Sequence, residues 1–199
     1  MSTLLFEAVK ANQSLQLRTL LQEGADPDAR DETGETPLTW AAHLGHTAVV
    51  KHLLAAGVDV EAVGRRFKAP PLVLAARIGA RGVVALLAVH ADLDAQDAAG
   101  ATALMRAVER PEDLVKPQRQ IAAIIRTLLD LGAVPDIKDF EGNTALMWAV
   151  RWDNAEAVRL LAAAGADLTV RNHAGESALD LADAEGDTEM LRLIRDLEK

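Results

Sequence analysis

The sequence DETGETPLTWAAHLGHTAVVKHLLAAGVDVEAV, residues 31–63, carries the local signals of one small helix–turn–helix unit. Thr36 has the hydroxyl group favoured at a helix N-cap, and Pro37 follows at the first helical position, where its missing N–H costs nothing. Gly45 ends this first helix, and Gly57 supplies a left-handed residue at the end of a second helix. Because each short helix has one apolar face, a single unit cannot bury that face and requires neighbouring copies.

The same pattern recurs along the chain. Residues 139–171, DFEGNTALMWAVRWDNAEAVRLLAAAGADLTVR, repeat it over 33 residues. The end of the second helix recurs as LLQEGAD, LLAAGVD, LLDLGAV and LAAAGAD. A glycine occupies one turn position in four copies and a leucine one helix position in five, namely Gly34, Gly100, Gly142 and Gly175, and Leu38, Leu72, Leu104, Leu146 and Leu179. A fixed period of this length predicts stacked repeats.

The G-x-T-P-L segment, the two helices and the L-L-x-x-G-A-D ending together resemble the ankyrin repeat. The resemblance extends from about Leu4 to Lys199 and implies an all-α repeat solenoid of stacked helix–turn–helix repeats with β-turn or hairpin tips. Polar residues mark the first and last repeats as caps. We therefore expect residues 1–199 to form a single ankyrin-repeat domain, with repeats at about 4–30, 31–64, 65–96, 97–138, 139–171 and 172–199.

Composition narrows the classes of function. The 21 basic residues are outnumbered by 30 acidic ones, and the formal net charge of −9 argues against nucleic acid as a partner. The chain has no Cys, which excludes disulfides, thiolate metal sites and Cys nucleophiles. No signal-peptide pattern is present, and no apolar stretch approaches the ~20 residues that span a bilayer. We expect a cytoplasmic protein with no nucleic-acid or membrane partner, and a monomer because both end repeats are polar.

Residues for catalysis or metal binding form no recognisable set. His43 and His46 lie three positions apart, but no third ligand has a suitable spacing. None of the three serines lies in a nucleophile-elbow pattern, and the glycines at 79–82 lack the phosphate-loop pattern. We therefore expect no enzymatic activity, no catalytic residue, no cofactor and no metal site.

The third and fourth repeats depart from the pattern. In the third, Ala69-Pro70-Pro71 replaces the hydroxyl cap, and the register of the tip is open by one residue. The fourth repeat has about nine extra residues at 109–118. This insertion is either a tolerated surface loop, since lengthening a loop costs little entropy, or an element that contributes to specificity.

The resemblance also implies where a partner binds, because ankyrin-repeat proteins typically use the turn tips and the exposed end of the first helix, which line the concave face. In the second repeat these positions include Glu35 and His43. In the following repeats they combine large aromatic residues with arginines, a mixture typical of protein-binding hot spots. The candidate partner-binding residues are Arg66, Phe67, Arg77, Ile78, Arg110, Phe140, Arg151 and Trp152.

One segment of this surface is basic. Residues 64–90 contain no Asp or Glu, and their basic residues are Arg65, Arg66, Lys68, Arg77 and Arg81. In an acidic chain, a basic segment with aromatic residues predicts a partner with acidic and apolar surface. The alternative is that the tip residues pack on neighbouring tips within the repeat array. Trp40 and Trp148 occupy one recurring helix position, which favours packing in the core or lining of a groove.

Two functions are compatible with these features. The first is a non-enzymatic protein–protein interaction module that binds its partner through the concave face. The second is an inhibitory or protective partner that covers the active site of an enzyme, with the 109–118 insertion as a plug.

Overall fold

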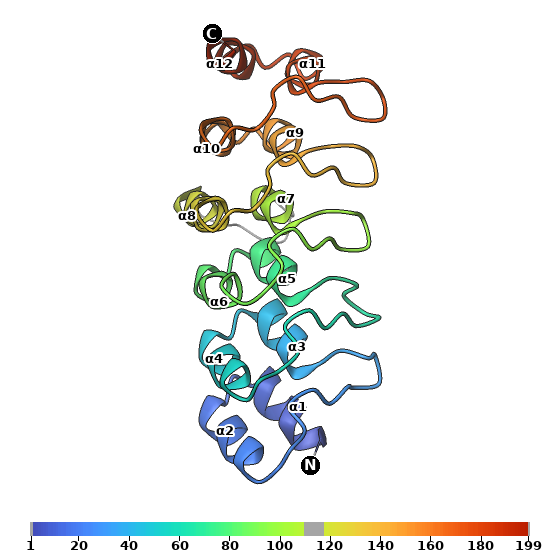
Figure 1. Ribbon diagram of the computed structural model, residues 1–199, viewed down its shortest axis with the longest axis vertical. Coiled ribbons are helices and arrows are strands. Elements are labelled where there is room, and N and C mark those ends of the chain that lie inside the picture. The colour runs from blue at the N-terminus through green and yellow to red at the C-terminus, as the bar shows by residue number, and fades with distance from the viewer. Residues whose placement is uncertain (1, 110–117, 199) are drawn as a thin grey trace. The chain divides into compact units, whose positions relative to one another are not determined.

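A computed structural model describes residues 2–109 and 118–198. Its chain forms two compact units, Met1–Asp92 and Leu93–Lys199, which we call the first and second unit and describe separately. The described residues contain twelve helices and no strand, and the helices form the six successive pairs that the sequence predicts (Figure 1). The predicted fold class, an all-α solenoid of helix–turn–helix repeats with hairpin-shaped tips, is confirmed.

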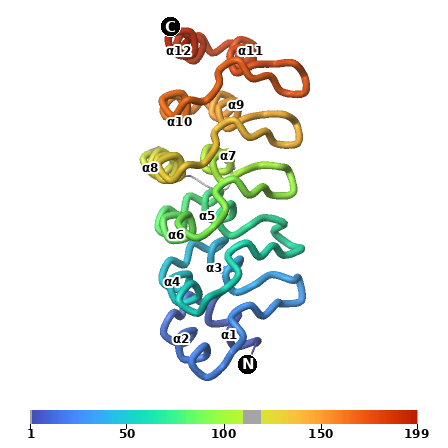
Figure 2. Tube along the Cα trace, viewed as in Figure 1, coloured from blue at the N-terminus to red at the C-terminus, as the bar shows by residue number. Residues whose placement is uncertain are grey.

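The first unit has three repeats. Its helices are α1 (Ser2–Lys10), α2 (Ser14–Gln22), α3 (Pro37–Leu44), α4 (Thr47–Ala55), α5 (Pro71–Ile78) and α6 (Arg81–Leu87). The first helix of each pair lies in an inner row, where α3 contacts both α1 and α5. The second helices lie in an outer row, where α4 contacts α2 and α6. The tips extend from the inner row as long turns (Figure 2).

The second unit repeats this arrangement. Its helices are α7 (Ala103–Val108), α8 (Gln118–Asp130), α9 (Ala145–Arg151), α10 (Ala155–Ala163), α11 (Ala178–Ala184) and α12 (Thr188–Leu197). The inner helix α9 contacts α7 and α11, and the outer helix α10 contacts α8 and α12. No helix in the described part of the chain is long and apolar enough to cross a bilayer.

The core of each unit is built from the recurring apolar positions. Leu38, Leu72, Leu104 and Leu146 are each at most 1% exposed. Burial of one such side chain contributes about 1.5–3 kcal/mol. Leu179, at the same position of the last repeat, is only half-buried. This matches its place in a terminal repeat, which has a neighbour on one side only.

Helix ends follow the sequence signals. The Thr36 hydroxyl accepts a hydrogen bond from the backbone N–H of Thr39, and the Thr39 hydroxyl lies 2.9 Å from the N–H of Thr36, which completes a capping box. Gly45 ends α3 in the left-handed region at φ 74°, and Gly57 follows α4 at φ 76°. These caps fix where each inner helix begins, and therefore which of its side chains lie beside the tips.

The tip of the third repeat is one residue longer than the others. In the second repeat the N–H of Gly34 donates to the carbonyl of Asp31, three residues earlier. In the third, the N–H of Lys68 donates to the carbonyl of Gly64, four residues earlier. Lys68 therefore takes the left-handed position of Gly34, with φ 51°. This settles the register that the sequence left open, because the extra residue precedes Lys68.

Arg110 and most of the 109–118 insertion lie outside the described residues, so their roles in binding stay predictions. That residues 1–199 form a single domain also stays a prediction.

Candidate functional site

In the second, fourth and fifth repeats a carboxylate at the start of the tip holds a side chain of the inner helix. In the second repeat, Asp31 Oδ1 accepts hydrogen bonds from the backbone N–H groups of Thr33 and Glu35, at 2.9 and 3.0 Å. Its Oδ2 accepts one from Trp40 Nε1 at 2.7 Å. Burial raises the pKa of Asp31, but the hydrogen bonds from Thr33, Trp40 and the backbone outweigh burial and hold it below its usual value.

The fifth repeat has the same geometry. Asp139 Oδ1 accepts from the N–H groups of Glu141 and Asn143 at 2.9 and 2.8 Å, and its Oδ2 accepts from Trp148 Nε1 at 2.8 Å. In the fourth repeat Asp97 holds Arg106 in this way, with Nε 2.7 Å from Oδ2. Both tryptophans are half-buried and line the surface between tips and inner helices, rather than lying in the core.

In the second unit this surface contains a pocket of about 590 Å³. Phe140 at the tip is 68% exposed, whereas Trp152, which ends α9, is half-buried. The guanidinium of Arg106 lies 5.2 Å from the centre of the Trp148 ring. The lining residues are Ala99, Arg106, Asp139, Phe140, Glu141, Trp148, Arg151 and Trp152. The pocket therefore combines three aromatic side chains with charges of both signs.

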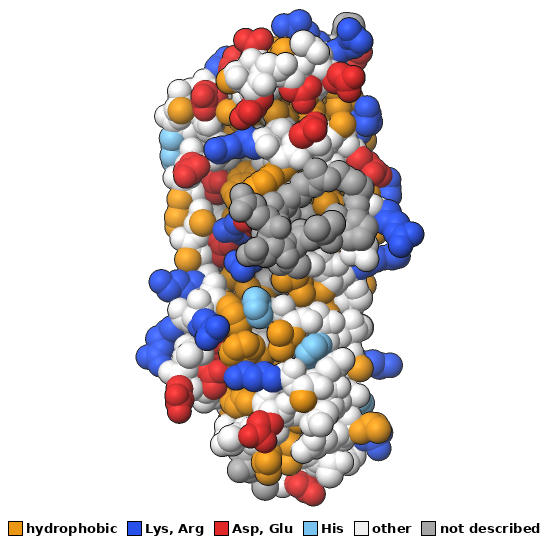
Figure 3. All heavy atoms as spheres, turned by 180° about the vertical axis from the view of Figure 1, so that it is seen from behind, with side chains coloured by type: hydrophobic (Ala, Val, Ile, Leu, Met, Phe, Trp, Pro, Cys, Tyr) orange, Lys and Arg blue, Asp and Glu red, His pale blue; other side chains and the backbone are white. Residues whose placement is uncertain are grey.

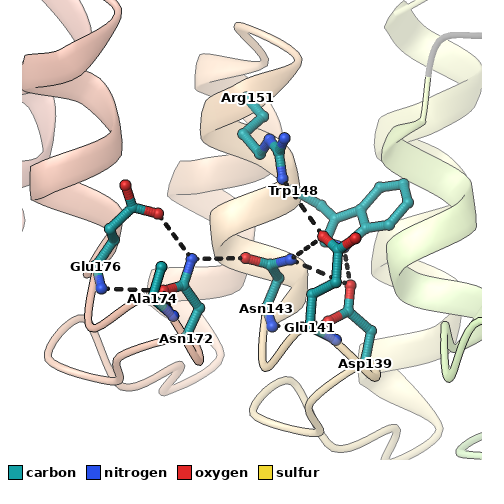
Figure 4. Close-up of polar contacts among 8 residues, drawn as sticks. All are labelled: Asp139, Glu141, Asn143, Trp148, Arg151, Asn172, Ala174 and Glu176. Atoms are coloured by element: carbon teal, nitrogen blue, oxygen red, sulfur yellow. Dashed lines mark hydrogen bonds and ion pairs between the residues drawn. The ribbon is translucent and has the colours of Figure 1, made fainter.

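An asparagine ladder joins the tips beside this pocket (Figure 4). Asn143 Nδ2 donates to Glu141 Oε2 at 3.2 Å, and more weakly to Asp139 Oδ2 at 3.4 Å. Asn172 of the next tip donates from Nδ2 to Asn143 Oδ1 and to Glu176 Oε2, both at 3.1 Å. These bonds hold the tips of the fifth and sixth repeats in one arrangement without a ligand.

In the first unit an aromatic cluster occupies the corresponding surface. Phe67 stacks on His43 with ring centres 4.2 Å apart, and meets Trp40 edge to face at 5.0 Å. Lys10 Nζ lies 4.0 Å from the centre of the Trp40 ring, and Arg66 Cζ lies 5.4 Å from it. Phe67 is half-buried and packs on the inner helix α3 of the preceding repeat, rather than on a neighbouring tip.

Glu35, expected at the exposed surface, is fully buried, and that expectation was wrong. Its Oε1 accepts hydrogen bonds from the backbone N–H groups of Arg66 and Phe67, at 2.8 and 2.9 Å. The reason is Gly64, which stands where other tips have Asp or Asn. A Cβ atom placed on Gly64 would lie 2.1 Å from Glu35 Cδ. The Glu35 carboxylate thus fills the place of the missing tip side chain.

His43 lies in a positive environment. Burial lowers the pKa of His43 below its usual value of 6.5, and the charges of Arg77 and Arg66 lower it further, while Glu35 opposes them. Its Nδ1 is buried and has no hydrogen-bond partner among the described residues. Arg77 and Ile78, at the end of α5, are both half-buried.

Comparison with known proteins assigns the fold to a family. The family described as ankyrin repeats, in three copies, matches residues 5–88, 72–172 and 118–198. The chain belongs to the ankyrin-repeat family. Ankyrin repeats are protein-interaction modules, so the broad class of function is confirmed, without naming a partner.

Curated ankyrin-repeat relatives are much longer than this chain. The palmitoyltransferase Hip14 of Drosophila melanogaster is 36% identical over 211 residues, which cover 90% of this chain and 33% of Hip14. The ankyrin repeat and KH domain-containing protein mask-1 of Caenorhabditis elegans is 31% identical over 97% of this chain and 7% of its own length. The chain spans a third or less of these relatives.

Two solved structures match over nearly their full length. An ankyrin repeat domain from Acinetobacter baumannii AYE superimposes with a TM-score of 0.85 at 26% identity, covering 98% of this chain and 97% of that one. A chain in the complex of a predatory endopeptidase from Bdellovibrio bacteriovorus with an immunity protein gives a TM-score of 0.77 at 28% identity, with 97% of both chains covered.

The tips and the ends of the inner helices bring most of the candidate partner-binding residues into two groups. Phe140, Arg151 and Trp152 line the pocket of the second unit. Arg66, Phe67 and Arg77 surround His43, and Ile78 follows Arg77.

Sequence reasoning did not assign Arg106 and Trp148 to this surface as binding residues. Their signal was the spacing of nine residues between the tip Asp and the inner-helix side chain, which recurs in three ankyrin repeats.

Proposed function

We propose that this ankyrin-repeat chain is a non-enzymatic protein-interaction module that binds a partner protein through its tips and inner helices. The observation that carries the proposal is Phe140, which is 68% exposed at the edge of a pocket of about 590 Å³. A large aromatic side chain left in water beside an aromatic-lined pocket is typical of an interaction site.

The pocket of the second unit supplies the apolar anchor. Trp148 and Trp152 offer ring surface to an inserted side chain, and the exposed Phe140 ring adds apolar surface at the edge. Arg151 and Glu141, 3.9 Å apart at their nearest charged atoms, supply polar contacts at the rim. Because Asp139 and the asparagine ladder already hold the tip, little ordering entropy is lost on binding.

The first unit supplies a basic surface. Arg65, Arg66, Lys68, Arg77 and Arg81 make no ion pair with a carboxylate among the described residues, and basic side chains crowd one edge of the lower half of Figure 3. This supports a partner that presents acidic and apolar groups.

A second candidate is an inhibitory or protective partner of an enzyme. It is favoured by the similarity to a chain found in the complex of a predatory endopeptidase with an immunity protein. In this case the same surface would cover an active site, and the partner would lose activity on binding.

The test is affinity capture with matched variants, followed by titration of the identified partner. One bait is the native chain, the second carries Phe140→Ala and Trp152→Ala, and the third carries Leu15→Ala. Leu15 is 74% exposed on the outer helix α2, so it controls for loss of exposed apolar surface. We expect the double variant to bind the partner at least about tenfold more weakly, and Leu15→Ala to bind as the native chain does.

Equal affinity of all three baits would contradict the site. If the partner is an enzyme, its activity is then measured with and without the chain. Full activity in the complex would exclude the second candidate.

A further inference from the structure

His43 occupies an unusual position for an ionisable side chain. It lies in the last turn of α3, with one ring face stacked on Phe67. Its Nδ1 is buried and has no hydrogen-bond partner in the described part of the chain. A proton placed on this ring would therefore have no acceptor in the free protein at that atom, which favours the neutral imidazole.

The charges around His43 favour the neutral form as well. Arg77 comes from α5 and Arg66 from the third tip, and both act on the ring with the same sign as its own proton. Glu35, from the second tip, is the opposing charge. On α1, Lys10 Nζ lies over Trp40, and at the start of α4 His46 Nε2 lies 3.4 Å from the Lys10 carbonyl.

Two arginines of the second unit, Arg106 and Arg171, are paired with carboxylates in a way that Arg66 and Arg77 are not. Arg106 pairs with Asp97 at 2.7 Å and with Glu109 at 3.0 Å, and Arg171 pairs with Asp180 at 2.8 Å. All ion pairs within the described residues lie in the second unit. At His43 the charges of Arg77 and Arg66 outweigh that of Glu35, so this surface is positive and suits a bound anionic group.

We propose that the surface formed by His43, Arg66 and Arg77 binds an acidic segment of a partner protein, and that His43 takes up a proton when the segment docks. The proposal rests on the proposed function, since it takes the partner to be a protein. The occupant is specified by charge complementarity, because carboxylates are the side-chain groups that neutralise paired guanidinium groups directly. Phe67 and Trp40 provide adjacent apolar surface for the rest of the segment.

Proton uptake is expected because a docked carboxylate changes the electrostatic potential at His43 from one that disfavours a proton to one that favours it. In the free chain His43 stays neutral down to a lower pH than an ordinary histidine. Carboxylates placed at Arg66 and Arg77 cancel the charges that oppose protonation and add an attraction to the imidazolium. By linkage, affinity must then rise as the pH falls, by at most about tenfold per pH unit for one proton.

The experiment measures binding of hexaglutamate to the full chain by calorimetry at about pH 7.5 and about pH 5.5, where glutamate carboxylates remain largely ionised. Hexaglutamine is the neutral control peptide. We expect hexaglutamate to bind more tightly at the lower pH by about three- to tenfold, and hexaglutamine not to bind. A proton NMR titration of the histidine rings should show the His43 resonance titrating at higher pH with hexaglutamate present.

Variants separate the proton effect from the charge effect. In His43→Gln the affinity for hexaglutamate should no longer rise between about pH 7.5 and about pH 5.5, whatever its value at the higher pH. Arg66→Gln with Arg77→Gln should weaken binding at both pH values. Lys51→Gln removes a positive charge from the outer helix α4 of the same unit and should leave binding unchanged.

Several results would overturn the proposal. One is no binding of millimolar hexaglutamate, and another is a pH gain that persists in His43→Gln. Tighter binding of a uridine hexanucleotide than of hexaglutamate would assign the surface to nucleic acid instead. A partner lost by the Phe140 and Trp152 variant but unaffected by the Arg66 and Arg77 variant would leave the proposed function intact and remove only this inference.

Discussion

The Trp40 and Trp148 sites are built on the same hydrogen bond but differ in the phenylalanine beside the indole. Each indole N–H donates to a tip aspartate, at 2.7 Å to Asp31 and at 2.8 Å to Asp139. Both indoles line a pocket, of about 490 Å³ at Trp40 and about 590 Å³ at Trp148. At the first site Phe67 of the next tip meets the indole edge to face, whereas at the second Phe140 stays 68% exposed at the edge of the pocket. A repeated scaffold therefore places equivalent side chains alike, and the neighbouring tips decide which ring contacts they make.

The cause of the difference is local to the third tip. This tip has one more residue than the others and has Gly64 in place of the usual tip Asp. The N–H groups of Arg66 and Phe67, which lack an acceptor within their own tip, turn to Glu35 of the preceding repeat. Phe67 of this tip also meets Trp40 edge to face. In the second unit, Asn172 opens the next tip and keeps these bonds within it.

The largest expected effect is that of Glu35→Ala, which removes the acceptor of two backbone N–H groups. We expect the first unit to lose about 2–4 kcal/mol of unfolding free energy, because buried donors are left unsatisfied. Urea unfolding combined with hydrogen exchange of the α3 and α5 amides measures this. Glu35→Gln keeps an acceptor oxygen and should cost less.

The same comparison supplies a rescue variant. Adding Gly64→Asp to Glu35→Ala gives the third tip the carboxylate that the other tips have, and should recover part of the loss. Failure of this recovery would mean that Glu35 does not substitute for a tip side chain.

A smaller effect separates the two phenylalanines. Phe67→Ala removes ring contacts with Trp40 and His43 and should cost about 2 kcal/mol, less than for a fully buried Phe. Phe140→Ala should lower the free energy of unfolding by no more than about 0.5 kcal/mol, because the Phe140 ring is 68% exposed. Thermal or urea unfolding of both variants gives the two values, and equal losses would contradict the contrast between a packed and an exposed ring.

The smallest expected effect is the dependence of stability on pH through His43. Its pKa in the folded chain is depressed, so the unfolded chain binds more protons at mildly acidic pH. The stability that the neutral ring supports is present above pH 6.5 and declines as the pH falls through the folded-state pKa.

The measurement is urea unfolding at several pH values between about 7.5 and 5. His43→Gln should flatten the curve of the first unit, whereas His173→Gln, on an exposed tip of the second unit, should not. A native chain with the same slope as His43→Gln would show that the ring environment does not disfavour its proton.

Much of the fold could be read from local signals. Thr36, Gly45 and Gly57 predicted helix boundaries because caps and left-handed glycines act within a few residues. The tip surface was harder, since exposure of a tip residue depends on the neighbouring repeat. Phe140 is exposed as expected. Glu35 is buried because Gly64, in the tip of the next repeat, leaves room for its carboxylate.

The sequence alone determined the repeat length, the pairing of helices and the leucines that fill the core, because these depend on periodicity and on the hydrophobic effect. It also carried the basic segment 64–90. Only the tertiary structure decided that Glu35 serves the third tip, that Phe67 packs on Trp40 and His43, and that Phe140 stays exposed. Those outcomes depend on contacts between adjacent repeats, where one additional residue in a turn redirects side chains that the repeat pattern treats as equivalent.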